Sequence, residues 1–235
     1  MARQRSDVLK ALDLEVWVRR GRKSDPSREV DAESGRAAES AAALDWDRLE
    51  SAVAGCVKCA LHAGRTRTVF GVGDRQAGLM VVGEAPGAEE DRQGLPFVGR
   101  AGQLLNAMLQ AIGFARDEVY IANVLKCRPP NNRDPRPDEV GCCLPYLERQ
   151  IALVDPRVIL CVGRIAAQNL LGTDVSLGRL RGQVHAFGTE GRPVIVTYHP
   201  AYLLRSPAEK AKAWQDLLRV QDLLGDTATV GERIS

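Results

Sequence analysis

The chain has 235 residues, of which 45% are hydrophobic and 26% charged, and its formal net charge is +2. This composition excludes a largely disordered chain and is ordinary for a protein with a core of its own. No apolar run approaches the roughly 18 residues of a membrane-spanning helix, and the N-terminus lacks an apolar signal core, so we expect a cytoplasmic protein without a membrane partner. The small net charge means that any nucleic-acid binding must come from a local basic face.

The two ends of the chain differ in character from its middle. Apolar residues between 6 and 18 favour a short docking element, whereas 19–43 contain one valine as their only large apolar residue, which is typical of a flexible linker. We therefore expect an N-terminal extension and linker at 1–45 and a short C-terminal tail at 226–235. The sequence leaves two alternatives open for the extension: contact with an unknown protein partner, or no specific role.

The main domain, which we place at 46–225, alternates helix and strand signals. Asp45 is a suitable cap for a short helix that ends near residue 54. Short apolar runs predict strands at 79–84, 119–126, 158–163 and 193–200. Apolar residues at helical spacing predict helices within 99–114, from Pro137 to about residue 154, and at 164–172 and 207–224. This alternation predicts an α/β fold with a mostly parallel sheet and helices on both faces.

Polar motifs lie at the ends of three of the predicted strands. They are GEAPG at 83–87 in the first strand, Asn123 in the second, and His199 in the last. Ligands of parallel sheets bind at the carboxyl ends of the strands. The sequence therefore predicts one binding site to which all three motifs contribute.

The cysteines form a second candidate site. The chain has six of them, at Cys56, Cys59, Cys127, Cys142, Cys143 and Cys161. In a cytosolic protein they indicate a metal or cluster site more than disulfides, and the CxxC at 56–59 is a good chelating pair. The wide spacing of the other cysteines suits an iron–sulfur cluster or some structural zinc sites, and spacing alone does not choose between them, nor between Cys142 and Cys143. Cys161 lies in an apolar strand and is predicted to be a buried thiol.

Several motifs, taken together and in order, are specific to one family. They are CxxC at 56–59, GEAPGAEED at 83–91, LPFVGRAGQLL at 95–105, NVLKCRPPNNR at 123–133, Cys143, and YHPAYLLR at 198–205. With them the chain resembles the iron–sulfur (family 4) uracil-DNA glycosylases from about Cys56 to about Leu218. The resemblance implies a three-layer αβα sandwich with a mostly parallel central sheet. It also implies a [4Fe-4S] cluster, whose ligands would be Cys56, Cys59, Cys127 and Cys143.

The resemblance further implies an enzyme of base-excision repair. Such an enzyme hydrolyses the N-glycosidic bond of deoxyuridine in DNA, releases uracil and leaves an abasic site, after flipping the base into a pocket. Asn123 is the candidate reader, since its amide can donate to uracil O4 and accept from N3–H. Phe97 is the candidate stacking platform. His199 is the candidate catalytic residue that stabilises negative charge on the departing base.

The loop after the first strand would line the same pocket. Gly83, Glu84 and Ala85 are the expected substrate-binding residues there. Better-known families carry an aspartate base where Ala85 stands and a tyrosine that blocks thymine where Gly87 stands. Family 4 enzymes generally lack both, and Glu90 is our candidate for orienting the water.

The segment after His199 is predicted to be loop-like and is the candidate DNA contact. Leu203 or Leu204 would act as an apolar wedge in the opened duplex, and Arg205 would touch a phosphate. Ordinary packing at the start of a helix is the alternative for the leucines.

Two other functional classes remain open from the residues. One is an iron–sulfur or zinc module that recognises uracil-containing or single-stranded DNA without turnover. The other is a nucleotide-binding α/β protein, which the acidic residues around GEAPG oppose. No basic, histidine-containing insertion of the kind that traps some relatives on DNA occurs between Phe97 and Asn123, which favours turnover. We expect a monomer, because the motifs need no second chain.

Overall fold

The computed structural model describes residues 40–225. The expected docking element at 6–18, most of the extension at 1–45 and the tail at 226–235 lie outside the described residues. Within 40–225, none of the helices has the length and apolar character needed to cross a membrane.

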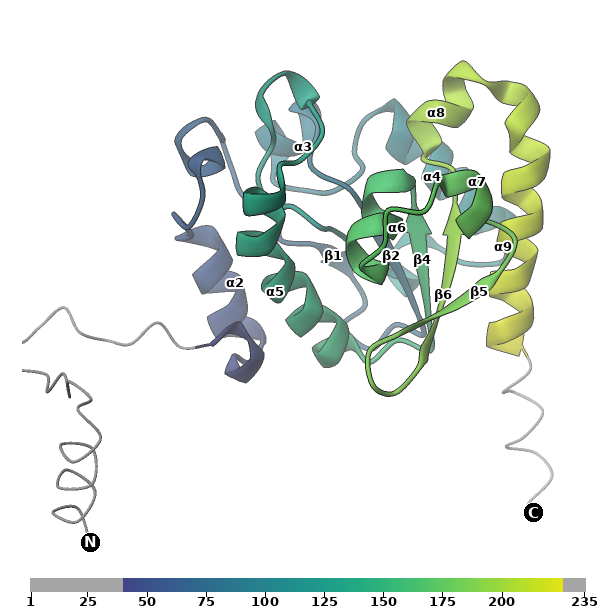
Figure 1. The fold of residues 1–235 in the computed structure, drawn as a ribbon, viewed down its shortest axis with the longest axis horizontal. Helices are drawn as coiled ribbons and strands as arrows, with labels where there is room; N and C mark the ends of the chain where they lie inside the picture. Colours follow the sequence, from purple (N-terminus) through teal and green to yellow (C-terminus); the bar gives the residue numbers. More distant parts are fainter. Residues whose placement is uncertain (1–39, 226–235) are drawn as a thin grey trace, which may run out of the picture. The chain divides into compact units, whose positions relative to one another are not determined.

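A six-stranded sheet forms the centre of the fold (Figure 1), in the order β1-β3-β2-β4-β6-β5. Its strands are β1 (Val72–Gly73), β2 (Leu79–Gly83), β3 (Tyr120–Asn123), β4 (Val158–Val162), β5 (Val184–Phe187) and β6 (Arg192–Thr197). The four inner strands are parallel, and β1 and β5 pair antiparallel at the edges. The expected mostly parallel sheet is confirmed.

Helices cover both faces of the sheet, so the fold is the expected three-layer sandwich. One face carries α2 (Trp46–Ala54), α5 (Pro137–Val154), α6 (Arg164–Leu171) and α7 (Leu177–Leu180). The other carries α4 (Arg100–Ala111), α8 (Pro200–Arg205) and α9 (Lys210–Gly225). Side chains alternate along each strand, so Met80 and Val82 enter one core while Leu79 and Val81 enter the other.

Short elements complete the described chain. They are the helix α3 (Ala88–Gln93) and the 3₁₀ turns η1 (Ala41–Ala43), η2 (Ala60–Ala63), η3 (Arg116–Glu118), η4 (Pro130–Asn132) and η5 (Pro207–Glu209). The folded part begins earlier than residue 46, because Ala41 and Leu44 are buried and the Leu44 carbonyl accepts a hydrogen bond from Arg149 of α5. The Asp45 cap is confirmed, since its carboxylate accepts from the backbone N–H of Arg48.

Several expected boundaries differ from the structure; β6, for example, ends at Thr197 rather than near residue 200. Strand β3 ends at Asn123 rather than near 126, although the N–H groups of Val124 and Leu125 still bond to the carbonyls of Gly83 and Glu84. The stretch after His199, which the sequence suggests is a loop, forms helix α8. Pro200 is its first residue, where its missing N–H costs nothing.

The sheet topology opens a crevice at one end of the molecule. The chain leaves β2 toward α4 on one face, but leaves β3 and β4 toward α5 and α6 on the other. Diverging connections at the carboxyl ends of parallel strands create the usual ligand crevice of α/β sheets. The register pairs Gly83 with Asn123, so the last residues of β2 and β3 meet side by side at this edge.

Neighbouring leucines of α9 test this packing. Leu217 is 2% exposed against the sheet, whereas Leu218 is 37% exposed. We expect Leu217→Ala to lower the free energy of unfolding by about 2–5 kcal/mol through lost burial and a cavity. Leu218→Ala should change it by less than about 0.5 kcal/mol. Urea denaturation of both variants measures this, and equal effects would contradict the assigned orientation of α9.

Candidate active site

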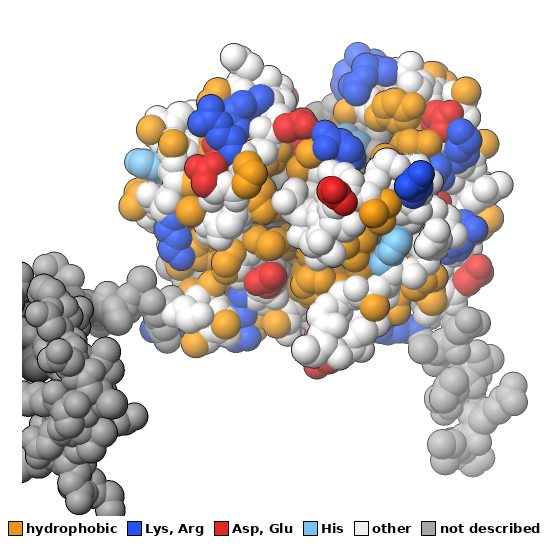
Figure 2. Space-filling model, viewed as in Figure 1, with side chains coloured by type: hydrophobic (Ala, Val, Ile, Leu, Met, Phe, Trp, Pro, Cys, Tyr) orange, Lys and Arg blue, Asp and Glu red, His pale blue; other side chains and the backbone are white. Residues whose placement is uncertain are grey.

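A cleft of about 470 Å³ lies at the carboxyl ends of the parallel strands. Its walls include residues from all three predicted strand-end motifs and three further candidate site residues: Glu84, Ala85, Gly87, Asn123 and His199, together with Glu90, Phe97 and Arg205. The strand ends therefore converge as the sequence predicts. Figure 2 shows the molecule hollowed along its upper edge, where α8 begins, with basic side chains on both sides of the hollow.

Asn123 carries an unpaired polar atom at the base of the cleft. The residue is 2% exposed, and its Oδ1 is buried without any hydrogen-bond partner in the structure. Buried acceptors are nearly always paired, and an unpaired one costs about 1–3 kcal/mol, so the cleft holds an acceptor in need of a donor. A side chain at Gly83 would lie 2.3 Å from this oxygen and 2.6 Å from the Phe97 ring. Glycine is therefore required at position 83.

Phe97 forms one wall of the cleft in a constrained conformation. Its φ of 52° lies in the left-handed region, which is unusual for an aromatic residue and is characteristic of functional sites. Its ring centre lies 5.8 Å from that of His199, with 30° between the ring planes. A Cβ at Gly102 would lie 1.8 Å from the Phe97 carbonyl oxygen, so this glycine lets α4 approach the loop.

Charged side chains fix the loop that carries Phe97. Glu90 Oε1 accepts the backbone N–H groups of Val98 and Gly99 at 3.0 and 3.1 Å. From the other side, Arg116 donates to the Pro96 carbonyl at 2.6 Å. Glu90 thus binds the loop as well as lining the cleft, a task that the sequence does not reveal. Its second oxygen faces Gly87, where a Cβ would lie only 2.7 Å away.

His199 enters the cleft as a neutral hydrogen-bond donor. Its Nδ1 accepts the backbone N–H of Ala201 at 3.1 Å, which places the proton of the neutral ring on Nε2. Burial, and secondarily the positive charge of Arg205, lowers the pKa of His199 to about 4. The neutral tautomer with an Nε2–H therefore predominates at physiological pH.

Glu84 lies at the cleft wall beside an ion pair. Burial, assisted by the negative charge of Asp134, raises the pKa of Glu84 to about 7, while Arg164 acts in the opposite direction. Asp134 and Arg164 are themselves paired at 2.7 Å. Glu84 is thus partly protonated near neutral pH.

The candidate DNA contacts separate into buried and exposed residues. Leu203 is 1% exposed and packs in the core with α4 and α9, so the suggestion that it inserts into DNA is not compatible with its position. Leu204 is 38% exposed and remains the candidate wedge. Arg205 lines the cleft next to it. Leu203 and Leu204 differ in exposure because adjacent residues of helix α8 point about 100° apart around its axis.

The cleft also contains residues to which the sequence assigned no individual role, among them Pro129, Asn132, Asp134 and Tyr202. Arg133, whose loop the sequence suggests could follow the DNA backbone, lines the cleft as well. Arg133 is held by both oxygens of the buried Glu139, at 2.5 and 2.9 Å. Asn131 and Asn132 both adopt positive φ, which asparagine tolerates better than most residues, so the NN pair is a signal for this turn.

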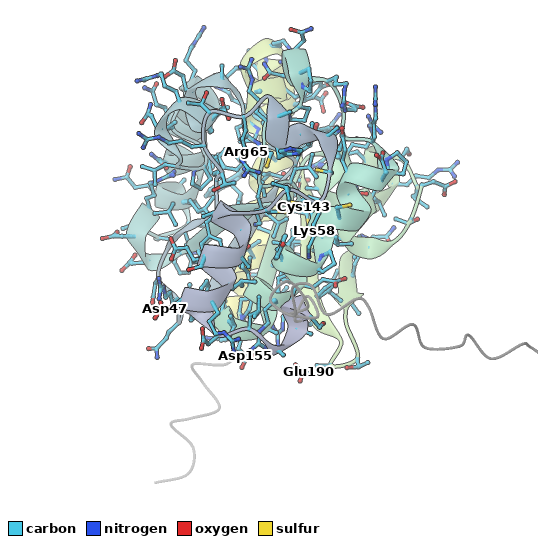
Figure 3. The ribbon with its side chains drawn as sticks, turned by 90° about the vertical axis from the view of Figure 1, so that its left-hand side faces the viewer. Asp47, Lys58, Arg65, Cys143, Asp155 and Glu190 are labelled. Carbon is cyan, nitrogen blue, oxygen red and sulfur yellow. The ribbon has the colours of Figure 1, made fainter. Side chains whose placement is uncertain are left out.

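The second candidate site is a small cavity between α2, η2 and α5. Five of the six cysteines line it: Cys56, Cys59, Cys127, Cys142 and Cys143. Figure 3 shows Lys58, Arg65 and Cys143 together near the middle of this side of the molecule. The Arg65 guanidinium donates to Cys127 Sγ at 3.3 Å, and the Lys126 backbone N–H donates to Cys143 Sγ at 3.2 Å.

The remaining thiols differ in their surroundings. Cys142 donates its S–H to the Lys58 carbonyl at 3.3 Å. Cys161 is fully buried in β4 away from the cavity, as predicted. Within residues 40–225, no three His, Cys, Asp or Glu side chains form a group that could hold a single metal ion.

Comparison with known proteins agrees with this geometry. Residues 70–218 match the family described as the uracil DNA glycosylase superfamily. The chain belongs to this family. The type-4 uracil-DNA glycosylase of Archaeoglobus fulgidus is 45% identical over 185 residues, which cover 76% of this chain and 93% of that protein. That of Pyrobaculum aerophilum is 45% identical over 180 residues, covering 74% and 92%.

A second type within the superfamily is also similar to this chain. The type-5 uracil-DNA glycosylase of Thermus thermophilus is 32% identical over 151 residues, which cover 57% of this chain and 68% of that protein. The similarity to type-4 proteins is higher and longer. The family predicted from the motifs is therefore confirmed.

The raised pKa of Glu84 has a measurable consequence for stability. Between its ordinary pKa of 4.5 and about 7, the folded state binds more protons at Glu84 than the unfolded state. The free energy of unfolding of the wild type, relative to Glu84→Gln, should therefore fall as the pH rises through this window. Urea titrations at several pH values measure the difference. Glu89→Gln is the control, because Glu89 is exposed on α3; a flat difference for Glu84→Gln would contradict the assignment.

Proposed function

We propose that the cleft is the active site of a DNA-repair glycosylase that hydrolyses the N-glycosidic bond of deoxyuridine in DNA. The product would be free uracil and an abasic site. The observation that carries the proposal is the buried, unpaired Oδ1 of Asn123 in the cleft. A flipped uracil supplies the missing donor through N3–H and accepts from the Asn123 amide through O4. Cytosine presents the opposite pattern and would leave both groups unpaired.

Phe97 and His199 would complete recognition and stabilise the leaving group. The Phe97 ring offers a face on which the base stacks, a contact worth about 1–3 kcal/mol in nucleic-acid binding proteins. The Nε2–H of neutral His199 would donate to uracil O2 as negative charge develops there. A single donor of this kind contributes about 10²–10³ in rate. The left-handed Phe97 backbone and the Ala201–His199 hydrogen bond hold both groups before substrate binds.

The water nucleophile would be oriented by Glu90. Its Oε1 is engaged by the loop, and its Oε2 is available on the side of Gly87. Because the glycosidic bond breaks with oxocarbenium character, the water needs orientation more than a strong base. Gly83, Glu84 and Ala85 would form the wall along the base.

The duplex would lie across the cleft entrance. Leu204 would insert where the base has left the stack, and Arg205 would contact a neighbouring phosphate. The basic side chains on both sides of the hollow suit the same path (Figure 2). The groups assigned to the cleft need no second copy of the chain, so we propose a monomer. Its catalytic domain would span about residues 41–225, with the preceding residues as an extension.

A [4Fe-4S] cluster is the group that best suits the cysteine cavity, with Cys56, Cys59, Cys127 and Cys143 as ligands. The thiols line one cavity but do not form a group around a single point. Tetrahedral zinc would require four ligands that converge on one point. Donors already face two of the sulfurs, and such hydrogen bonds are usual around clusters. Because hydrolysis needs no electron transfer, we assign the bound cluster a structural role. It would cross-link the CxxC at 56–59 to α5.

Asn123→Asp tests the reading role. An ionised carboxylate has no donor for uracil O4, so single-turnover release of uracil from an oligonucleotide should fall by at least about 100-fold. Alkali cleavage of the abasic product measures the rate, and a thymine oligonucleotide serves as the negative substrate.

Asn106→Asp is the matched control, because its oxygen accepts from Arg116 and a carboxylate can do the same. Unchanged excision by Asn123→Asp would remove Asn123 as the reader. Uracil binding without cleavage by the wild type would favour the binding module over the enzyme.

Neighbouring cysteines of α5 test the ligand set. Cys143→Ser should lose most of the bound iron and the visible absorbance of the cluster, because serine is a poor ligand for iron–sulfur centres. Cys142→Ser should retain both. Iron content and absorbance are measured on the purified chains, and the reverse pattern would show that Cys142 is the ligand.

A further inference from the structure

Lys126 is a buried lysine inside the NVLKCRPPNNR motif, and the proposed chemistry gives it no role. It is 1% exposed and lies between Asn123, the proposed reader, and Cys127, a proposed ligand. Its ammonium donates to the Asn123 backbone carbonyl at 2.9 Å and to Gln150 Oε1 at 2.5 Å. Both acceptors are neutral, no carboxylate among residues 40–225 pairs with it, and Cys143 is the ionisable group that acts on its charge.

Gln150 gives the ammonium a fixed anchor. It is completely buried in α5, and its Nε2 donates to the Phe70 carbonyl at 2.9 Å and to the Tyr120 hydroxyl at 3.1 Å. Both of its amide atoms are therefore engaged, which sets its orientation. The Lys126 ammonium is thus placed by a rigid neighbour and not by its own flexible stem.

The backbone of Lys126 is fixed as well. Its N–H donates to Cys143 Sγ at 3.2 Å, and its carbonyl accepts the Val69 N–H at 2.8 Å. The segment from Asn123 to Cys127 is consequently held by two main-chain contacts at Lys126 and by the ammonium at the Asn123 carbonyl. These contacts fix the main chain of Asn123, from which its side chain enters the cleft.

Burying an ammonium among neutral acceptors is expensive, and an apolar side chain of similar length would fill the space without that cost. We propose that Lys126 is a positioning residue for base recognition: its ammonium holds the Asn123 carbonyl and thereby aims the Asn123 amide into the cleft. The inference rests on the proposed function, because it assigns a task to the residue that holds the reader. A displacement of about 1 Å at such a group can cost roughly 100-fold in rate.

Lys126→Met removes the ammonium and keeps an unbranched side chain of similar length. In single-turnover excision by the full chain, we expect the maximal rate to fall by about 10- to 100-fold. The enzyme concentration for half-maximal rate should change by less than about twofold, because the phosphate contacts are untouched. Iron content should be unchanged, since the Lys126 N–H to Cys143 remains.

A double-mutant cycle separates positioning from general destabilisation. If Lys126 acts through Asn123, then adding Lys126→Met to Asn123→Ala should lower the remaining rate by less than about twofold. Leu217→Ala is the control for lost stability, because it lies in the core away from the cleft and should retain the wild-type rate. Equal effects of Lys126→Met in both backgrounds, or a wild-type rate for the single variant, would overturn the inference.

A crystal structure of Lys126→Met gives a readout that does not depend on activity. We expect the Asn123 amide to leave its present orientation or to occupy more than one; an unchanged single orientation would overturn the proposal. If Lys126→Met does not fold, Lys126→Gln retains a neutral donor and should show an intermediate rate, and full wild-type activity would count against the inference. A wild-type chain that releases no uracil, with Asn123 ordered as here, would instead defeat the proposed function.

Discussion

The parallel pairing of β2 with β3 is the constraint on which the active site depends. It places Gly83 directly beside Asn123, and the missing side chain at Gly83 leaves the space in which Asn123 Oδ1 and the Phe97 ring meet. Glycine in a buried strand has an entropic cost. Here the missing side chain allows the Asn123 amide and the Phe97 ring to lie at one strand end, where a Cβ at position 83 would clash with both.

The cleft is also a place where the fold tolerates local instability. An unpaired buried oxygen at Asn123, a left-handed backbone at Phe97 and a carboxyl at Glu84 with a raised pKa all face the same space. Each is unfavourable in the free protein, and surrounding contacts maintain them, notably Glu90 and Arg116 on the Phe97 loop. Such preorganisation is expected at a site whose groups must already have the geometry that the transition state requires before substrate binds.

A short segment of chain joins the two candidate sites. Three residues separate Asn123 from Cys127, and Lys126 among them contacts the Asn123 carbonyl with its side chain and Cys143 with its backbone. The cysteine cavity and the cleft are therefore joined by this short segment, in which Lys126 contacts residues of both.

Local pattern in the sequence was sufficient for the α/β class, the parallel inner strands, the Asp45 cap and the motifs that identify the family, because these depend on periodicity and spacing along the chain. It did not reveal the antiparallel edge strands, the helix at α8, the burial of Leu203 or the loop contacts of Glu90. Those features depend on which distant segments pack together. The same holds for Lys126, which the sequence alone would place on the surface. Its burial and its contacts with the Asn123 carbonyl and with Gln150 of α5 are seen only in the tertiary structure.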